Sequence, residues 1–199
     1  MHWNDLENVL KDYLSIPSKE ITYIVSPFIN PGLLESILQS KWDQEVVVIT
    51  SWRKDHLLAG VSKIEIYDVV KRHPKWSLFI NDRLHSKFYS NDLISALIGS
   101  ANLTYSALQD RKDSNYELLT YIEMSDLDRN SFRSLLEDSN LVDEEYYQKC
   151  LEWYDQNRDQ FEKLPTDSIV PKEGKDWFLI SSLPASISPM RIWDIIVEA

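Results

Sequence analysis

The stretch LHSKFYSNDLISALIGSAN, residues 84–102, is the part of this 199-residue sequence that best predicts its fold and chemistry. It holds a histidine, a lysine, an aspartate and a glycine–serine–asparagine group in the spacing H-x-K-x4-D-x6-G-S-x-N. If residues 84–89 form a strand, His85 and Lys87 point to the same face, because side chains alternate along a strand. An imidazole beside an ammonium is a poor core pair. It is a good phosphate site, in which lysine supplies positive charge and histidine a nucleophile or base.

The polar residues that follow this pair can complete such a site. Gly99 permits close approach of the backbone to a ligand, and Ser100 and Asn102 supply a hydroxyl and an amide for phosphate oxygens. Such donors stabilise charge that develops on phosphorus. Glu117 begins a later strand pattern and can accept a hydrogen bond from a ring nitrogen of His85, which would fix the tautomer of the imidazole.

Outside this stretch, hydrophobic periodicity predicts alternating helices and strands. We expect helices over residues 4–14, 31–40 and 55–59, and strands over residues 21–25, 45–50 and 63–67. Such alternation indicates a sheet with parallel character that is covered on both faces. Further strands are expected over residues 76–80, 84–89, 95–98 and 116–122. The first three are separated by short turns, which favours antiparallel pairing.

The remaining sequence, residues 125–199, is expected to be a helical extension with a tail. Helical periodicity runs over residues 125–163, whereas residues 164–199 hold an apolar run at 177–180. That tail is either packed on the domain or the start of a region cut away. The prediction is an α/β fold with a mixed sheet and helices on both faces, in which residues 1–124 form the catalytic domain and residues 125–199 an extension on it.

The motif resembles the HKD motif of the phospholipase D superfamily, with every spacing intact. The likeness extends to the surrounding sequence, over roughly residues 20–123. It is carried by residues 24–28, 84–89, 98–104 and 115–117.

This resemblance implies a role for each matched residue. His85 would be the nucleophile that forms a phosphohistidine, and Lys87 and Asn102 would hold the phosphate with help from Ser100. Glu117 would orient His85. Asp92 belongs to the motif but is more often structural than catalytic in this family. No metal or other cofactor is implied.

Family members that act as monomers carry two copies of the motif, and this chain carries one. Neither His56 nor His73 is followed by the remainder of the pattern. We therefore expect a homodimer that places both copies of His85 at a two-fold axis. One imidazole would attack, and the other would protonate the leaving group.

Single-copy members of this size resemble bacterial nucleases, so we expect a nucleic-acid substrate, DNA rather than RNA. Residues 50–112 hold 10 Lys/Arg and 6 Asp/Glu, a local charge of +4 within a chain of net charge −11. Trp52 is a candidate for stacking on bases, although a tryptophan is more often packed in the core. Arg53, Lys54 and Arg83 are candidates for contact with the nucleic-acid backbone, with a solvated surface as the alternative. The wider candidate set is Lys71, Arg72, Lys75, Arg111, Lys112 and Trp76.

The acidic total is unusual for a nuclease that grips DNA alone. We expect a separate domain or subunit to deliver the DNA, as in a restriction or antiphage defence system. Alternatively, the acidic helices over residues 125–163 bind that partner or block the cleft, or the substrate is a small phosphodiester that is hydrolysed or transferred. A non-catalytic binding module is a further alternative, although such modules usually lack the histidine or the lysine.

Several classes of protein are excluded at this stage. No run approaches about 18 apolar residues, so no membrane span is expected. Cys150 is the single cysteine, which excludes an internal disulfide and a thiolate metal cluster. The first residues lack the features of a signal peptide, so the expected compartment is the cytoplasm.

Overall fold

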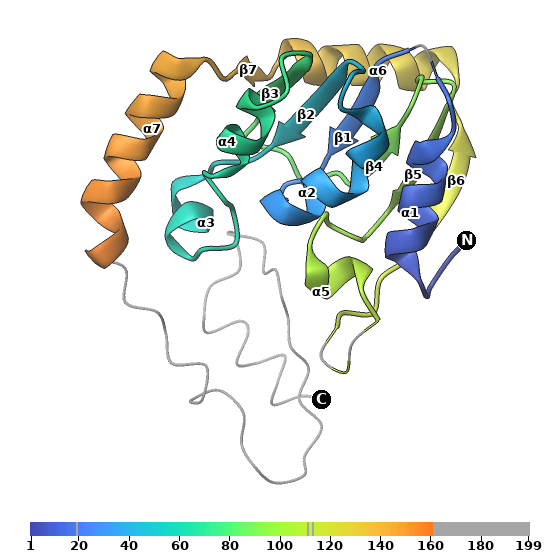
Figure 1. The fold of residues 1–199 in the computed structure, drawn as a ribbon, viewed down its shortest axis with the longest axis horizontal. Helices are drawn as coiled ribbons and strands as arrows, with labels where there is room; N and C mark the ends of the chain where they lie inside the picture. The colour runs from blue at the N-terminus through green and yellow to red at the C-terminus, as the bar shows by residue number, and fades with distance from the viewer. Residues whose placement is uncertain (19, 111, 113, 161–199) are drawn as a thin grey trace, which may run out of the picture. The chain divides into compact units, whose positions relative to one another are not determined.

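The computed structural model describes residues 1–18, 20–110, 112 and 114–160, which fold around one seven-stranded sheet (Figure 1). The strand order is β6-β5-β4-β1-β2-β3-β7. The strands are β1 (Thr22–Val25), β2 (Val46–Thr50), β3 (Trp76–Ile80), β4 (Phe88–Ser90), β5 (Ser95–Gly99), β6 (Leu119–Glu123) and β7 (Asn140–Leu141).

Helices connect and cover these strands. They are α1 (Leu6–Ser15), α2 (Pro31–Ile37), α3 (Lys54–Leu58), α4 (Ile66–Lys71), α5 (Tyr105–Leu108), α6 (Asp126–Glu137) and α7 (Glu144–Asn157), with 3-10 turns η1 (Gln39–Lys41) and η2 (Arg158–Gln160). No helix in this described part is both long enough and apolar enough to cross a bilayer.

The sheet is mixed, and it changes direction at β1. Strands β1, β2 and β3 run parallel, with Ile24 opposite Val48 and Val48 opposite Leu78. On the other side of β1, strands β4, β5 and β6 pair antiparallel in turn. The expected mixed α/β fold is therefore confirmed, including the antiparallel pairing of β4 with β5.

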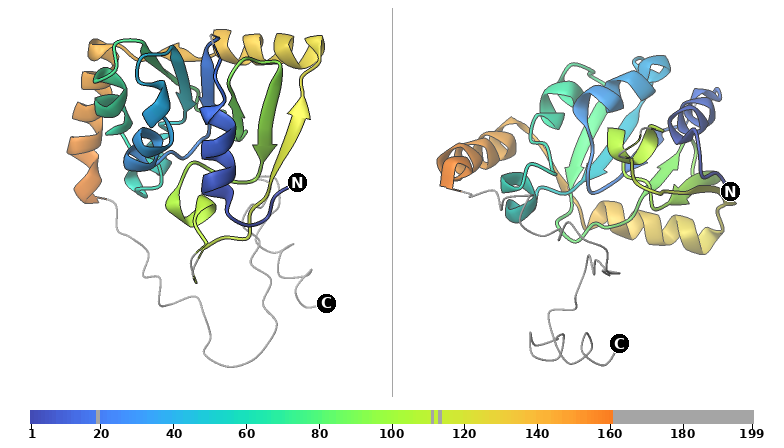
Figure 2. Two further views of the ribbon diagram at one scale, coloured as in Figure 1. Left: turned by 45° about the vertical axis from the view of Figure 1, so that its right-hand side comes forward. Right: turned by 90° about the horizontal axis from the view of Figure 1, so that it is seen from below.

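Helices lie on both faces of the sheet, as Figure 2 shows. Neighbouring strand residues point to opposite faces, so Ile24 and Val48 belong to one core and Val25 and Ile49 to another. The larger core contains the buried leucines of α1 and α2 and the buried valines of α4. The smaller core is closed by α6 through Phe132, whose ring packs against Tyr23 and Phe88.

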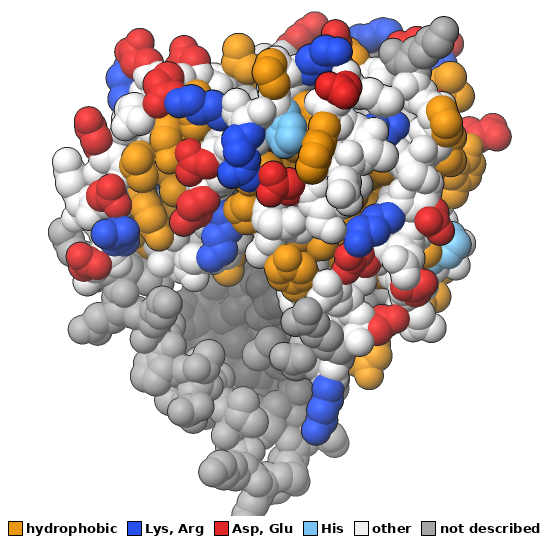
Figure 3. Space-filling view, in the orientation of Figure 1, with side chains coloured by type: hydrophobic (Ala, Val, Ile, Leu, Met, Phe, Trp, Pro, Cys, Tyr) orange, Lys and Arg blue, Asp and Glu red, His pale blue; other side chains and the backbone are white. Residues whose placement is uncertain are grey.

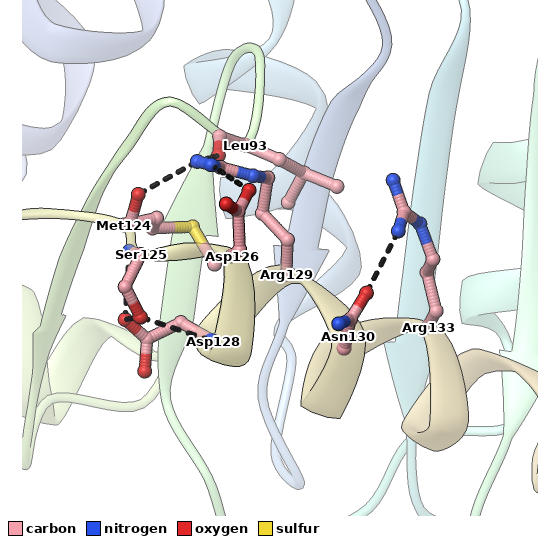
Figure 4. Close-up of polar contacts among 8 residues, drawn as sticks. All are labelled: Leu93, Met124, Ser125, Asp126, Asp128, Arg129, Asn130 and Arg133. Atoms are coloured by element: carbon pink, nitrogen blue, oxygen red, sulfur yellow. Dashed lines mark hydrogen bonds and ion pairs between the residues drawn. The ribbon is translucent and has the colours of Figure 1, made fainter.

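The start of α6 is fixed to the end of β6 by polar contacts (Figure 4). The Ser125 hydroxyl accepts from the Asp128 amide at 3.2 Å, and the Asp128 carboxylate accepts from the Ser125 amide at 2.8 Å. Arg129 donates to the Met124 carbonyl and to the Asp126 carboxylate, both at 2.6 Å. This capping box stabilises the first turn, so α6 holds a set direction across the sheet.

Several sequence-based predictions of secondary structure are wrong. Residues 116–118 are irregular, and β6 begins only at Leu119. Residues 63–65 are a turn and residues 66–67 already belong to α4, because Ile66, Val69 and Val70 are buried at helical spacing. Residues 84–87 are irregular, and the strand begins only at Phe88. Strand β3 pairs with β2 and not with β4, since the chain crosses from one side of β1 to the other between them.

The helical extension also contributes to the sheet. After α6, strand β7 pairs antiparallel with β3, and Leu141 lies opposite Phe79. Helix α7 then contacts the α4 region, where the rings of Tyr147 and Tyr67 stack with centroids 4.4 Å apart. The expected tail, residues 164–199, lies outside the described residues.

Candidate phosphoryl-transfer site

The predicted site residues gather at one edge of the sheet. The parallel strands β1, β2 and β3 all end there, and pairing of Val25 with Phe88 brings the start of β4 to the same edge. The ladder continues through Ile98 to Gly99, which lies opposite Leu119 at the start of β6. The edge therefore collects His85, Lys87, Ser100, Asn102 and Glu117. Ligand sites in α/β sheets favour such a change of strand direction at the carboxyl ends.

His85 and Lys87 lie in the irregular segment between β3 and β4. The Lys87 ammonium donates to the His85 carbonyl at 2.9 Å, which holds the segment compact. The His85 side chain is exposed, and Lys87 is half-buried. His85 lines a hollow of about 430 Å³ together with Arg83, Ser86 and Leu135 of α6. A nucleophile at this position is open to a ligand from solvent.

Burial lowers the pKa of Lys87 below its usual value, and the negative charge of Glu117 opposes this shift. The unfolded chain then binds more protons than the folded chain between the two pKa values. The free-energy cost of burying the Lys87 ammonium is therefore fully present at neutral pH. It disappears as the pH rises through the range in which lysine side chains lose their proton, at about pH 10.

The variant Lys87→Met should accordingly be as stable as the wild type at pH 7, or more stable by up to about 1 kcal/mol. This difference should shrink toward alkaline pH, as measured by denaturant unfolding at several pH values. Exposed Lys112 provides the control substitution to methionine. A loss of more than about 1 kcal/mol in Lys87→Met at pH 7 would contradict the argument.

Asn102 is held by Ser26, which lies in the matched stretch 24–28 but for which no role was predicted. The Ser26 hydroxyl lies 3.2 Å from Asn102 Oδ1 and 2.9 Å from the Phe28 carbonyl, and it accepts from the Leu103 amide at 3.3 Å. The contact fixes Oδ1 toward Ser26, so the Nδ2 donor lies at the opposite end of the amide. Ser26 is fully buried directly after β1. The signal for this role in the sequence is the position of Ser26, directly after the predicted strand at residues 21–25.

Gly99 and Ser100 join the site to β6. The Ser100 amide donates to the Leu118 carbonyl at 3.1 Å, and its hydroxyl accepts from the Leu118 amide at 3.2 Å. A Cβ atom at Gly99 would lie 2.0 Å from the Leu118 carbonyl oxygen. The missing side chain thus permits close approach of another strand, and contact of Gly99 with substrate stays a prediction.

Glu117 lies at the same edge, close enough to Lys87 to affect its pKa. Its carboxylate accepts from the Asn115 amide group at 3.2 Å. Within the described residues it makes no hydrogen bond with His85, so its orienting role stays a prediction. Beneath the site, the buried Tyr89 hydroxyl donates to the Ala101 carbonyl at 2.8 Å and supports the segment that leads to Asn102. Burial raises the pKa of Tyr89.

Asp92 stabilises the turn between β4 and β5. Its carboxylate accepts from the amides of Ile94 at 2.8 Å and Ser95 at 3.2 Å. This side-chain turn fixes the register that aligns Phe88 with Ile98. A structural role for this motif residue therefore accounts for its contacts.

The predicted basic residues divide into two groups. Arg53 and Lys54 follow β2 and Arg83 follows β3, so these three lie at the site edge. Arg53 is paired with Asp55 at 2.7 Å, and Lys54 lies 4.9 Å from the centre of the Trp153 ring. Among the described residues the Arg83 guanidinium has no ion pair, which leaves it available beside His85.

Lys71, Arg72 and Lys75 do not belong to a channel at the site. They precede β3 at the amino ends of the parallel strands, roughly 15 Å of strand away from the site edge. Lys71 pairs with Glu144, Arg72 with Glu35, and Lys75 donates to the Asp43 carbonyl. The expected grouping of these three with the site is therefore wrong. Arg111 lies outside the described residues, whereas Lys112 is exposed.

The expected stacking of bases on Trp52 is also wrong. Its side chain is 5% exposed, and its indole N–H donates to the Lys63 carbonyl at 3.3 Å. Trp76 is 6% exposed and stacks on His73. Both rings belong to the larger core, so neither can reach a base. A tryptophan beside a basic residue is a weak signal because core packing places it there as readily.

The described residues contain no cluster of three or more His, Cys, Asp or Glu side chains that could hold a metal ion. The donors at the site edge are an ammonium, an amide and a hydroxyl. These groups suit phosphate oxygens better than a cation.

Comparison with known proteins gives structural matches only. No protein-family model and no curated protein matches the chain in sequence. Nuc from Salmonella typhimurium, a phospholipase D family member, matches with a TM-score of 0.53 at 15% identity, over 68% of this chain and 89% of its own.

Phosphatidylserine synthase from Haemophilus influenzae Rd KW20 matches with a TM-score of 0.50 at 14% identity, over 78% of this chain and 43% of its own. NucT from Helicobacter pylori matches with a TM-score of 0.46 at 19% identity, over 74% of this chain and 88% of its own. At a TM-score of 0.53, the chain shares its α/β fold with Nuc, which agrees with the fold that the motif predicted.

Proposed function

We propose that this protein is a metal-independent phosphodiesterase that cleaves nucleic acid, DNA rather than RNA, through a phosphohistidine on His85. The observation that carries the proposal is the convergence of His85, Lys87, Ser100, Asn102 and Glu117 at one sheet edge, although they span 33 residues of sequence. An exposed imidazole beside a cation and two neutral donors is suited to attack on a phosphate whose charge the donors stabilise.

In the first step, a neutral ring nitrogen of His85 attacks phosphorus. The P–N bond forms as the bond from phosphorus to the leaving oxygen breaks. Lys87 and the Nδ2 donor of Asn102 hold the non-bridging oxygens, with the Ser100 hydroxyl assisting. The leaving oxygen takes a proton from a second imidazolium, because an alkoxide is a poor leaving group.

In the second step, water attacks the phosphohistidine. The second imidazole, neutral after the first step, removes a proton from this water, and the P–N bond breaks to restore His85. The products are an alcohol and a phosphomonoester. A homodimer supplies the second imidazole as the other copy of His85, since the chain contains one copy of the motif.

The charge distribution supports delivery of the DNA by another domain or subunit. On the face drawn in Figure 3, Lys and Arg side chains lie among Asp and Glu side chains. Among the described residues at the site edge, Arg53 is paired with Asp55 and Lys87 donates to the His85 carbonyl, which leaves Arg83 as a cation without an ion pair beside His85. Contacts from one or two free cations to the phosphate backbone of a nucleic acid give only weak non-specific binding. We therefore also propose that the protein acts as the nuclease module of a restriction or antiphage defence system.

The test is cleavage of single- and double-stranded DNA and RNA in EDTA, followed on denaturing gels. We expect wild-type protein to cut DNA in the chelator with unchanged rate and to leave 5′- or 3′-phosphate ends of one kind. Complete loss of cleavage in EDTA that is restored by added Mg²⁺ would overturn the metal-independent mechanism. Cleavage of small phosphodiesters without cleavage of any nucleic acid would move the substrate to that class.

A further inference from the structure

Beside Asn102 lies a second hollow, of about 450 Å³, that the mechanism above does not use. We call it the flanking pocket. It is bounded by the loop after β1, the turn after α3 and the chain that follows β5. The residues that matter for its chemistry are Phe28, Asn30, Val61, Asn102, Tyr105 and Asn115.

The walls of the flanking pocket combine flat apolar surface with amide groups. Val61 and Tyr105 are 45% and 39% exposed, an unusual fraction for large apolar side chains beside a hollow. Asn30 and Asn115 add amides that can donate and accept. A nucleobase has the same mixture, with apolar faces and a polar edge. An acyl chain could not pair with the remaining polar groups of these amides, Asn30 Nδ2 and Asn115 Oδ1, and covering them without a partner costs binding energy.

The polar and aromatic walls are held in place before any ligand binds. Phe28 packs edge-on against the His56 ring, with centroids 5.1 Å apart. Asn30 Oδ1 accepts from the Leu33 amide at 3.1 Å, and this contact caps α2. Such fixed walls reduce the entropy lost on binding.

The flanking pocket is joined to the phosphate site through two asparagines. Asn102 lines the pocket and is also the proposed phosphate donor. Asn115 lines it and donates to Glu117 at 3.2 Å. A phosphate seated at Asn102 therefore has its attached nucleoside at the mouth of this pocket.

We propose that the flanking pocket binds the base of the nucleotide next to the scissile phosphate, so that this nucleotide must be unpaired. The inference rests on the proposed function, and it adds the substrate class. A base within a duplex is stacked on both faces and cannot enter a pocket without being extruded, at a cost of a few kcal/mol. Single strands, frayed ends and gaps are then the preferred substrates.

The first test measures binding and needs no catalysis. Adenosine 5′-monophosphate and ribose 5-phosphate are titrated against the full chain by calorimetry. We expect the nucleotide to bind at least about tenfold more tightly, and Tyr105→Ala to weaken only the nucleotide by about tenfold. Tyr105→Phe keeps the ring and should lose about twofold at most. Tyr121→Ala removes an exposed tyrosine on β6, 53% exposed, and is the matched control.

The second test compares single-stranded oligonucleotides that differ by one abasic nucleotide beside the cut. We expect wild type to cut the abasic strand about tenfold more slowly than the intact strand. Tyr105→Ala should cut the two strands at equal rates. Equal affinity for the two phosphates, or equal cleavage of the two strands by wild type, would overturn the pocket while leaving the phosphodiesterase intact.

If no strand is cut but the nucleotide binds through Tyr105, the pocket stands and the proposed chemistry fails. If Tyr105→Ala changes the sedimentation coefficient and leaves nucleotide affinity unchanged, this face joins two copies of the chain, and the base pocket is rejected.

Discussion

Replacement of His85 by alanine should reduce phosphodiester hydrolysis at least about 1000-fold and leave the fold intact. The side chain is exposed, and its ring makes no hydrogen bond within the described residues. Its loss therefore removes the nucleophile without leaving a cavity. The free energy of unfolding should change by less than about 0.5 kcal/mol. Initial rates on DNA in EDTA, together with denaturant unfolding, measure both quantities.

His2→Ala is the matched control, because His2 is also an exposed histidine and contacts Leu119 through its backbone. It should keep the wild-type rate. Mixing wild type with an excess of His85→Ala chains should lower the rate per wild-type chain, because mixed dimers hold one imidazole in place of two. Wild-type rates in purified His85→Ala would remove this residue from the mechanism, and an unchanged rate on mixing would remove the shared site.

Gly99→Ala should destabilise the protein by about 3–5 kcal/mol, a large share of the stability of a domain of this size. The new Cβ would lie 2.0 Å from the Leu118 carbonyl oxygen and 2.9 Å from its carbonyl carbon. Both are backbone atoms, so relief requires β5 and β6 to separate where Gly99 pairs with Leu119. Thermal and denaturant unfolding measure the loss.

Gly32→Ala provides the comparison within the same chain. Gly32 lies in the first turn of α2, and an added Cβ would be 3.4 Å from its nearest neighbour, an ordinary contact. Alanine favours helix by up to about 1 kcal/mol over glycine, so this variant should be neutral or slightly stabilised. Equal stability of Gly99→Ala and wild type would show that β6 can shift away from β5 without cost.

The motif in residues 84–102, together with Glu117, predicted which residues gather at the site edge, and the alternation of apolar runs predicted a mixed α/β sheet. The motif spacing carries this information because the pairing register of neighbouring strands fixes where each residue lies on the sheet. Residues placed at the ends of β4, β5 and β6 must meet at one edge once those strands pair. The strands β1 and β2 were also predicted to within one residue, since their β-branched runs are buried on both faces.

The errors have physical causes of their own. The alternation of Ile64, Glu65 and Ile66 resembles a strand, but burial of Val69 and Val70 continues the pattern at helical spacing. Trp52 stands beside Arg53 in the sequence, whereas its ring points into the core. Ser26 was missed because its role depends on Asn102, which lies 76 residues away. Contacts of this range leave no local pattern.

The insertion of β1 between β2 and β4 has a consequence for synthesis on the ribosome. A nascent chain that has emerged through β3 carries the three parallel strands, and β1 is then an open edge of the sheet. Ser26 is already present, but its later partner Asn102 has not yet been synthesised. Strand β4, which covers this edge, is complete about 10 residues after β3. Asn102 and Glu117 follow about 22 and 37 residues after β3, the latter after roughly 2–7 seconds of translation. During this interval the exposed strand favours chaperone capture or aggregation. Under the proposed function, the growing polypeptide lacks Asn102 and Glu117 during this interval and so holds no complete catalytic site.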